Sequence, residues 1–231
     1  MIEYDVIQLV DKLKYSQWYH TPNFNLVKGL PILNRKDIQD MVMKKGVYSS
    51  ITSGSTGESV RVEKTIDDAV WGMAITIREY QWRKWDISKN LAMVTAPSPT
   101  KTYNHWGFPK QIYPIQGKVY QHKLETIDVL QEWFEQINPH YIYTYPTILE
   151  ELDLSRISNL IDVKSTGEKG GTSYSTEECG VIAISCPDNP SVYHVMENII
   201  LEVGKNGEAI VTCLTNPYIK RYNIEIGRAH V

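Results

Sequence analysis

A run of small polar residues near the start of the chain has the composition of a loop that binds phosphate. It reads Thr52, Ser53, Gly54, Ser55, Thr56, Gly57, Glu58 and Ser59, and extended runs flank it at residues 47–51 and 60–62. Glycines free the backbone from side-chain clashes, hydroxyl groups offer donors, and consecutive amide groups can wrap an anion. No lysine follows the second glycine, so this is not the lysine-containing loop of nucleotide hydrolases. The same composition also fits a hairpin turn.

A second group of residues has the types of a metal site. Cys179, Cys186, His194 and Cys213 could ligate zinc, but their spacings are irregular and contain no Cys-x-x-Cys pair. Three reduced thiols and a surface histidine are the alternative. With three cysteines and no export signal at the N-terminus, the chain is expected to lie in the cytoplasm.

The composition excludes several classes of partner. The 231 residues are 42% hydrophobic and 22% charged, with a formal net charge of -3, which is ordinary for a globular protein. Nucleic acid and anionic membrane surfaces usually require a clustered basic excess, and none is present. No stretch approaches the roughly 20 apolar residues of a membrane helix. The oligomeric state stays open.

Helical patterns surround the candidate phosphate loop. Residues 2–13 have helical apolar spacing, and Asn34 can cap a second helix over residues 35–45. The longest helical pattern runs from Thr65 to about Trp85, with acids in its first turn. The loop is therefore expected to lie between two strands that helices flank.

The rest of the chain alternates strands and helices and then becomes rich in strands. Strands are predicted at residues 91–96, 118–122, 141–145 and 161–165, and helices at 126–138 and 147–152, which is typical of an α/β layer with largely parallel strands. Beyond residue 180 short extended runs follow at 181–185, 199–203 and 209–214, and the turn at 204–207 predicts a hairpin.

Five stretches in chain order resemble the phenylacetate–CoA ligase and capsule-biosynthesis branch of the adenylate-forming enzymes. They are residues 30–38, 52–57, 165–168, 174–177 and 220–224, and residues 145–149 resemble a further segment. The resemblance implies an enzyme that uses ATP and Mg²⁺ to convert a carboxylic acid into an acyl adenylate, and then passes the acyl group to coenzyme A. Tyr103, Trp106, Phe108 and Tyr145 would suit an aromatic acid.

The resemblance also implies roles for individual residues. Residues 52–57 would bind the pyrophosphate, and Glu177 would hold Mg²⁺ while Thr176 contacts a phosphate oxygen. Tyr174 would stack on adenine, Gly167 and Glu168 would border the adenine and acyl pockets, and Arg221 is a further nucleotide-binding candidate. Without its neighbours, Glu177 would be read as a solvated acid beside Glu178.

The chain departs from the family's pattern in two places. Only residues 169–173 separate Glu168 from Tyr174, where the family has a helix and a strand, so a mobile or rearranged connection is expected there. After Ile224 the family continues with Gly-Asp and a small C-terminal domain that carries a lysine. Residues 225–231 instead resemble the translation of a sequencing adapter and are expected to have no biological role.

The expected fold class is α/β. Residues 1–224 are predicted to form a partial AMP-binding N-terminal domain, with mixed or parallel sheet layers and flanking helices to about residue 178 and a β-rich part over 179–224. The small C-terminal domain is expected to be absent. The parent protein is predicted to be an ATP-dependent acid–thiol ligase and this chain to be inactive. The alternative is a non-catalytic nucleotide-binding or interaction module.

Overall fold

The computed structural model describes residues 30–51, 60–96, 98–168, 170–205, 208–216, 218–219 and 222–224. The predicted helix at 2–13, the candidate loop at 52–59, Arg221 and the segment 225–231 lie outside the described residues. The chain divides into two compact units. The first unit combines Met1–Glu79 with Ser175–Arg228, and the second contains Tyr80–Tyr174.

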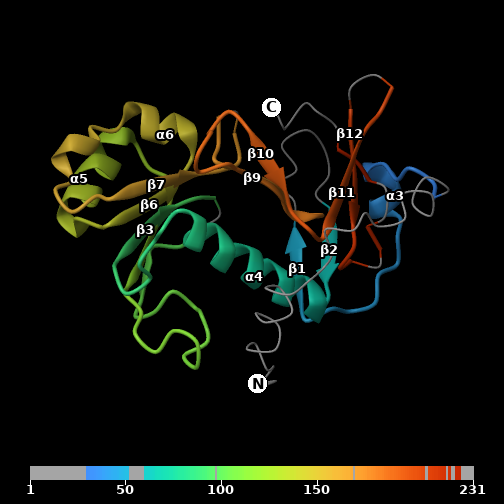
Figure 1. The fold of residues 1–231 in the computed structure, drawn as a ribbon, viewed down its shortest axis with the longest axis horizontal. Helices are drawn as coiled ribbons and strands as arrows, with labels where there is room; N and C mark the ends of the chain where they lie inside the picture. Colours follow the sequence, from blue (N-terminus) through green and yellow to red (C-terminus); the bar gives the residue numbers. More distant parts are fainter. Residues whose placement is uncertain are drawn as a thin grey trace. The chain divides into compact units, whose positions relative to one another are not determined.

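The second unit contains a five-stranded sheet with the order β4-β5-β3-β6-β7 (Figure 1). Its strands are β3 (Leu91–Val94), β4 (Lys101–Tyr103), β5 (Val119–His122), β6 (Tyr141–Thr144) and β7 (Asp162–Ser165). β3, β5, β6 and β7 run parallel, and β4 pairs antiparallel with β5. The largely parallel layer predicted from the alternating pattern is confirmed.

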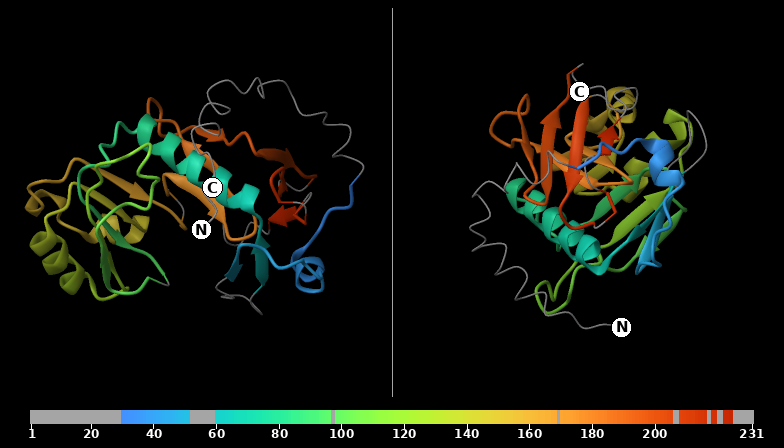
Figure 2. Two further views of the ribbon diagram at one scale, coloured as in Figure 1. Left: turned by 90° about the horizontal axis from the view of Figure 1, so that it is seen from below. Right: turned by 90° about the vertical axis from the view of Figure 1, so that its right-hand side faces the viewer.

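Two helices and a 3-10 turn of this unit are α5 (Ile127–Ile137), α6 (Pro146–Glu151) and η1 (Leu154–Arg156). Leu130 and Phe134 of α5 are fully buried in one cluster with Ala92, Val94 and Ile142 of the sheet. Seen from below in Figure 2, α5 lies alongside the strands. α5 ends where Asn138 adopts a left-handed conformation, with φ 47°, and donates its N–H to the Phe134 carbonyl.

His140, between α5 and β6, is expected to make the stability of this unit dependent on pH. Burial and then the nearby Lys89 lower the pKa of His140 from its usual 6.5, against the opposing effect of Asp86. The unfolded chain therefore binds more protons in acid, and the free energy of unfolding is expected to fall as the pH drops below about 6.5. Urea titrations at several pH values would measure this effect, and His140→Asn should remove part of it. An unchanged pH profile in that variant would contradict the prediction.

The first unit contains a two-stranded antiparallel pair, β1 (Tyr48–Ile51) and β2 (Arg61–Lys64). In the chain the pair lies between α3 (Arg35–Gln39) and α4 (Ile66–Trp82), and residues 66–79 of α4 belong to this unit. Thr65 and Asp68 begin α4 by exchanging hydrogen bonds between side chains and main-chain N–H groups. The predicted helix at 65–85 is thus confirmed, except that the chain leaves it before Lys84, whose φ is 56°.

α3 is shorter than the helix predicted over residues 35–45. It ends at Gln39 although the apolar spacing continues. Tertiary contacts explain the difference, because Gly46 donates its N–H to Glu63 Oε2 and Val47 donates to the Lys64 carbonyl. These contacts hold the chain against β2, where a side chain on Gly46 would clash with the Lys64 carbonyl.

The C-terminal part of the described chain consists of short strands, as predicted. One sheet has the order β10-β9-β8 and the other β11-β12-β13. The strands are β8 (Ser173–Thr176), β9 (Gly180–Ser185), β10 (Tyr193–Val195), β11 (Ile199–Val203), β12 (Ala209–Cys213) and β13 (Tyr222–Ile224). β11 and β12 form the predicted antiparallel hairpin. No helix in the described ranges has the length and apolar character needed to cross a bilayer.

Candidate functional site

The first unit contains a pocket of about 260 Å³ that includes two of the residues predicted to do chemistry, Thr176 and Glu177. β1, β2, α4 and the turn after β8 each contribute to its wall. The lining includes Tyr48 of β1, Lys64 of β2 and, from a later segment, Asn198.

The turn after β8 places two neighbouring acids, Glu177 and Glu178, in different surroundings. Thr176 ends β8, and its hydroxyl oxygen accepts the Cys179 N–H at 3.1 Å. Glu177 is exposed, and its carboxylate accepts no hydrogen bond from the described residues. Glu178 is buried, where its Oε1 accepts the Tyr222 hydroxyl at 3.3 Å and lies 3.9 Å from Arg35 Nη1. Of the two acids, Glu177 is the one available to a ligand.

The buried side chain of Tyr222 is the hydrogen-bond donor to Glu178. Burial and then the Glu178 carboxylate raise the pKa of the Tyr222 phenol well above its usual value. The phenol therefore stays protonated and can donate to Glu178. Glu178 is a structural acid that connects β13 with the turn after β8.

One face of the β1–β2 pair supplies another wall of the pocket. Tyr48 and Ser50 are two residues apart on β1 and so point to the same side, and Lys64 lies directly opposite Tyr48. The opposite face carries a polar cluster, in which Glu63 accepts hydrogen bonds from Ser49 and Arg61. Burial, then Asp68 and then Glu177 raise the pKa of Tyr48, so its hydroxyl remains a donor.

Asp68 lies at the N-terminal end of α4 and in the pocket wall. Its Oδ2 accepts the Thr65 N–H at 2.9 Å, and its Oδ1 accepts the Thr215 hydroxyl at 2.7 Å. The Cys213 sulfur lies 3.2 Å from the Thr215 hydroxyl and 3.9 Å from the Cys179 carbonyl. Oδ2 of Asp68 thus caps the start of α4, and Oδ1 connects α4 to the segment after β12.

The four candidate zinc ligands are not brought together as a set, although Cys179 and Cys213 are neighbours. Cys179 and Cys213 are buried, Cys186 is partly buried and His194 is exposed on β10. Across the described ranges, no three His, Cys, Asp or Glu side chains form a group that could hold a metal ion. Burial raises the pKa of the Cys179 thiol far above its usual range, and the neighbouring Cys213 raises it further.

Gly167, Glu168 and Tyr174 belong to the second unit, whereas Thr176 and Glu177 belong to the first. Gly167 has φ 81°, and a Cβ there would lie 2.9 Å from the ring of Tyr145. Glu168 Oε2 accepts the Thr147 N–H at 3.0 Å in the first turn of α6. In the described structure, Gly167 permits a tight turn and Glu168 caps a helix.

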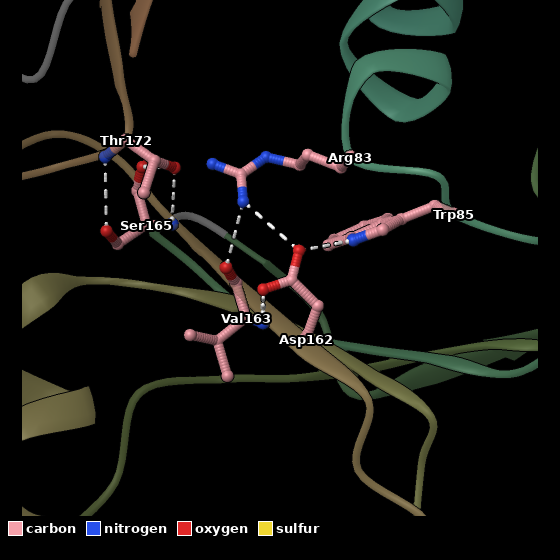
Figure 3. Close-up of polar contacts among 6 residues, drawn as sticks. All are labelled: Arg83, Trp85, Asp162, Val163, Ser165 and Thr172. Atoms are coloured by element: carbon pink, nitrogen blue, oxygen red, sulfur yellow. Dashed lines mark hydrogen bonds and ion pairs between the residues drawn. The ribbon is translucent and has the colours of Figure 1, made fainter. Parts of the chain in front are cut away.

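The connection from β7 to β8 is short and joins two different sheets. β7 belongs to the five-stranded sheet and β8 to the β10-β9-β8 sheet, so the chain does not return to the sheet that it leaves. Figure 3 shows the contacts on either side: Ser165 and Thr172 exchange hydrogen bonds, and Asp162 accepts from Arg83 and Trp85. Mobility of residues 169–173 stays a prediction.

The aromatic residues considered for an acyl pocket have packing partners in the second unit. The ring of Trp106 meets those of Tyr80, Trp85 and Tyr141 edge to face, with centroids 5.3 to 6.1 Å apart. Phe108 is buried and meets Tyr80 in the same way. These rings therefore form part of the core of this unit.

Sequence reasoning missed the pocket residues Tyr48, Lys64, Asp68 and Asn198. Alternation puts residues 48 and 50 on one face of their strand and residues 62 and 64 on one face of theirs, but whether the two faces coincide depends on the register across residues 52–59. Asn198 could not be found in this way, because its segment is distant in sequence.

No protein family profile and no curated protein sequence matches the chain. Among solved structures, the chain is similar to 2-hydroxyisobutyryl-CoA ligase in an open conformation with 2-HIB-AMP and CoA. The TM-score is 0.59 at 12% sequence identity, over 94% of this chain and 62% of that one. The same ligase in its thioesterification state, and in its postadenylation state with 2-HIB-AMP, gives TM-scores of 0.58 at 12% identity.

The chain spans 61–62% of the length of these ligase chains while 94% of its own residues are matched. At 12% identity the similarity concerns the fold and not individual site residues. The chain therefore shares the fold of a large part of these adenylate-forming CoA ligases.

Proposed function

We propose that this chain is part of an ATP-dependent ligase that converts a carboxylic acid into an acyl adenylate and passes the acyl group to coenzyme A. The observation that carries the proposal is the turn at Thr176 and Glu177. Both residues line the pocket to which β1 also contributes, and the Glu177 side chain is exposed. β1 and β2 flank the run Thr52 to Gly57 in sequence, which is the proposed phosphate loop. The shared fold supports the assignment at the level of chemistry.

In this proposal, Thr176 and Glu177 bind and orient the phosphates of ATP, and neither residue forms a covalent bond with the substrate. Thr176 would present its hydroxyl to a phosphate oxygen. The oxygens of Glu177 fit Mg²⁺, because they are exposed and accept no hydrogen bond from the described residues. When bound, Mg²⁺ would neutralise charge on the phosphates as the carboxylate attacks the α-phosphorus and pyrophosphate leaves. Gly167, Glu168, Tyr174 and Arg221 are proposed to contact the nucleotide or the acyl group.

The finer assignments rest on the sequence resemblance. They are the phenylacetate–CoA ligase-like branch, an aromatic acid as substrate and a cytoplasmic location. Zinc at the four Cys and His residues has no support in the geometry and is not proposed.

Exchange of pyrophosphate into ATP with a panel of aliphatic and aromatic acids tests the function. Acid-dependent exchange would establish adenylate formation, and the acid that supports it would identify the substrate class. Nucleotide binding without exchange would agree with the predicted inactivity of this chain by itself. Exchange by a longer protein that contains the chain would then separate a ligase from the alternative, a nucleotide-binding module. Absence of both would contradict the proposal.

Glu177→Gln is expected to weaken Mg²⁺-dependent ATP binding about tenfold, because it removes an anionic ligand while keeping the shape of the side chain. The readout is the affinity for ATP by calorimetry with and without Mg²⁺. Asp188→Asn is the matched control, since Asp188 is an exposed acid of the same unit outside the pocket wall. Equal effects of the two substitutions would count against Glu177 as a metal ligand.

A further inference from the structure

Lys64 is a buried residue whose ammonium group has one hydrogen-bond acceptor and no carboxylate partner among the described residues. Its residue is 5% exposed, and its Nζ donates to the main-chain carbonyl of Glu178 at 3.1 Å. Within the part of the chain that the structure describes, no carboxylate forms an ion pair with it. An ammonium group has three donors, and burying it without a counter-charge is unfavourable. The arrangement therefore calls for an anionic partner.

The acids that face the same pocket do not meet this need. Asp68 already accepts hydrogen bonds on both oxygens and lies at a helix N-terminus, which stabilises its charge. Glu177 is exposed and makes no ion pair with Lys64. Within the described residues, Lys64 therefore lines the pocket without an acidic partner.

Further polar groups line the same pocket. The hydroxyls of Tyr48 and Ser50 lie on the same face of the β1–β2 pair and have no hydrogen-bond partner among the described residues. Asn198 lines the pocket at 6% exposure, and its Oδ1 is buried without a partner. A buried polar group left unsatisfied in a native structure commonly marks a place for a ligand, ion or water. A protonated phosphate offers acceptors for Lys64 and the hydroxyls, and a P–OH donor for an acceptor such as Asn198.

The space is sufficient for such a group. A volume of about 260 Å³ is several times the ~30 Å³ that one water occupies in the liquid. A phosphate or a pyrophosphate could therefore enter with some of its water.

We propose that this pocket is a phosphate-binding subsite in which Lys64 supplies the positive charge, assisted by Tyr48, Ser50 and Asn198. Naming the pyrophosphate end of ATP as its occupant rests on the proposed function, whereas free inorganic phosphate or pyrophosphate offers the same chemistry. In the first case Lys64 supplies the cation that the run Thr52 to Gly57 lacks.

Calorimetric titration of the full chain with sodium pyrophosphate, inorganic phosphate and ATP tests the subsite, with acetate at equal ionic strength as the control anion. Saturable binding of pyrophosphate is expected. Lys64→Met should weaken it about tenfold or more, because a hydrogen bond to a charged group is lost. Lys45→Met is the matched control, since Lys45 is exposed in the same unit and lies outside the pocket wall, and it should leave the affinity unchanged.

Lys64→Met is expected to fold, because removing a buried and poorly compensated charge is commonly neutral or stabilising. If circular dichroism shows otherwise, Asn198→Asp tests the same pocket by placing a negative charge beside the phosphate, and it should also weaken binding. Absence of pyrophosphate binding in the wild type, or an unchanged affinity in the folded variants, would overturn the subsite.

The two proposals fail in different ways. Lys64-dependent pyrophosphate binding without any ATP binding would support the subsite and contradict the ligase function. ATP binding and exchange that are insensitive to Lys64→Met would support the ligase function and overturn the subsite.

Discussion

Phe134→Ala is expected to lower the free energy of unfolding of the second unit by about 3–5 kcal/mol, the cost of truncating a fully buried phenylalanine. Phe134 has no exposed surface and packs with Leu130, Ala92, Val94 and Ile142 between α5 and the five-stranded sheet. Truncation would remove its burial energy and leave a cavity, because the sheet strands around it can relax only partly.

Val129→Ala is the matched control for this substitution. Val129 lies on the same helix but is 45% exposed, so its truncation should cost well under the effect at Phe134. Hydrogen exchange of α5 and of β6 would follow the second unit separately from the first, which matters because a chain with two units need not unfold in one step. Similar losses for both variants would show that this cluster is not the core of the unit.

Arg78→Met is expected to destabilise the first unit by about 3 kcal/mol, since breaking a mostly buried ion pair leaves an uncompensated charge. The Arg78 guanidinium pairs with Glu197 Oε1, and the two side chains are 17% and 16% exposed. Glu197 Oε2 is buried without any partner among the described residues, so Arg78 is its main compensation.

The effect of Arg78→Met should extend to the pocket. Glu197 precedes Asn198, which lines the pocket wall, so phosphate binding should weaken together with stability. Arg156→Met provides the control, because the Arg156 side chain is 55% exposed in its pair with Glu135, and such pairs contribute about 0–1 kcal/mol. Adding Glu197→Gln to Arg78→Met should recover part of the stability in urea denaturation. No recovery would mean that packing, and not the unpaired charge, explains the loss.

The local elements were predictable where pattern and termination signals agree. α5 has apolar residues on one face and ends at an asparagine that tolerates a left-handed conformation. The hairpin of β11 and β12 follows from two extended runs around a glycine-containing turn. α3 was predicted too long because the contacts of residues 46 and 47 with β2 are invisible to helical spacing.

The candidate site was predictable only in part. Thr176 and Glu177 were singled out from the sequence, and the structure places both at one pocket, while their roles stay predictions. The sequence could not show that Glu178 is buried and paired while Glu177 is exposed, because the partners of Glu178, Arg35 and Tyr222, are distant in sequence. Lys64 was missed because its position opposite Tyr48 depends on strand register, which the sequence of residues 52–59 does not determine.

The division of the chain also bears on the order in which the protein folds during synthesis. Among the described residues, the second unit is one continuous segment, Tyr80–Tyr174, whereas the first is built from segments on both sides of it. Bonds such as Lys64 to Glu178 and Thr215 to Asp68 close loops of 114 and 147 residues. Long-range contacts form late, and contiguous domains can fold while the ribosome is still translating. We therefore expect the nascent chain to fold its middle first and to acquire the pocket only after residues 175–215 have emerged.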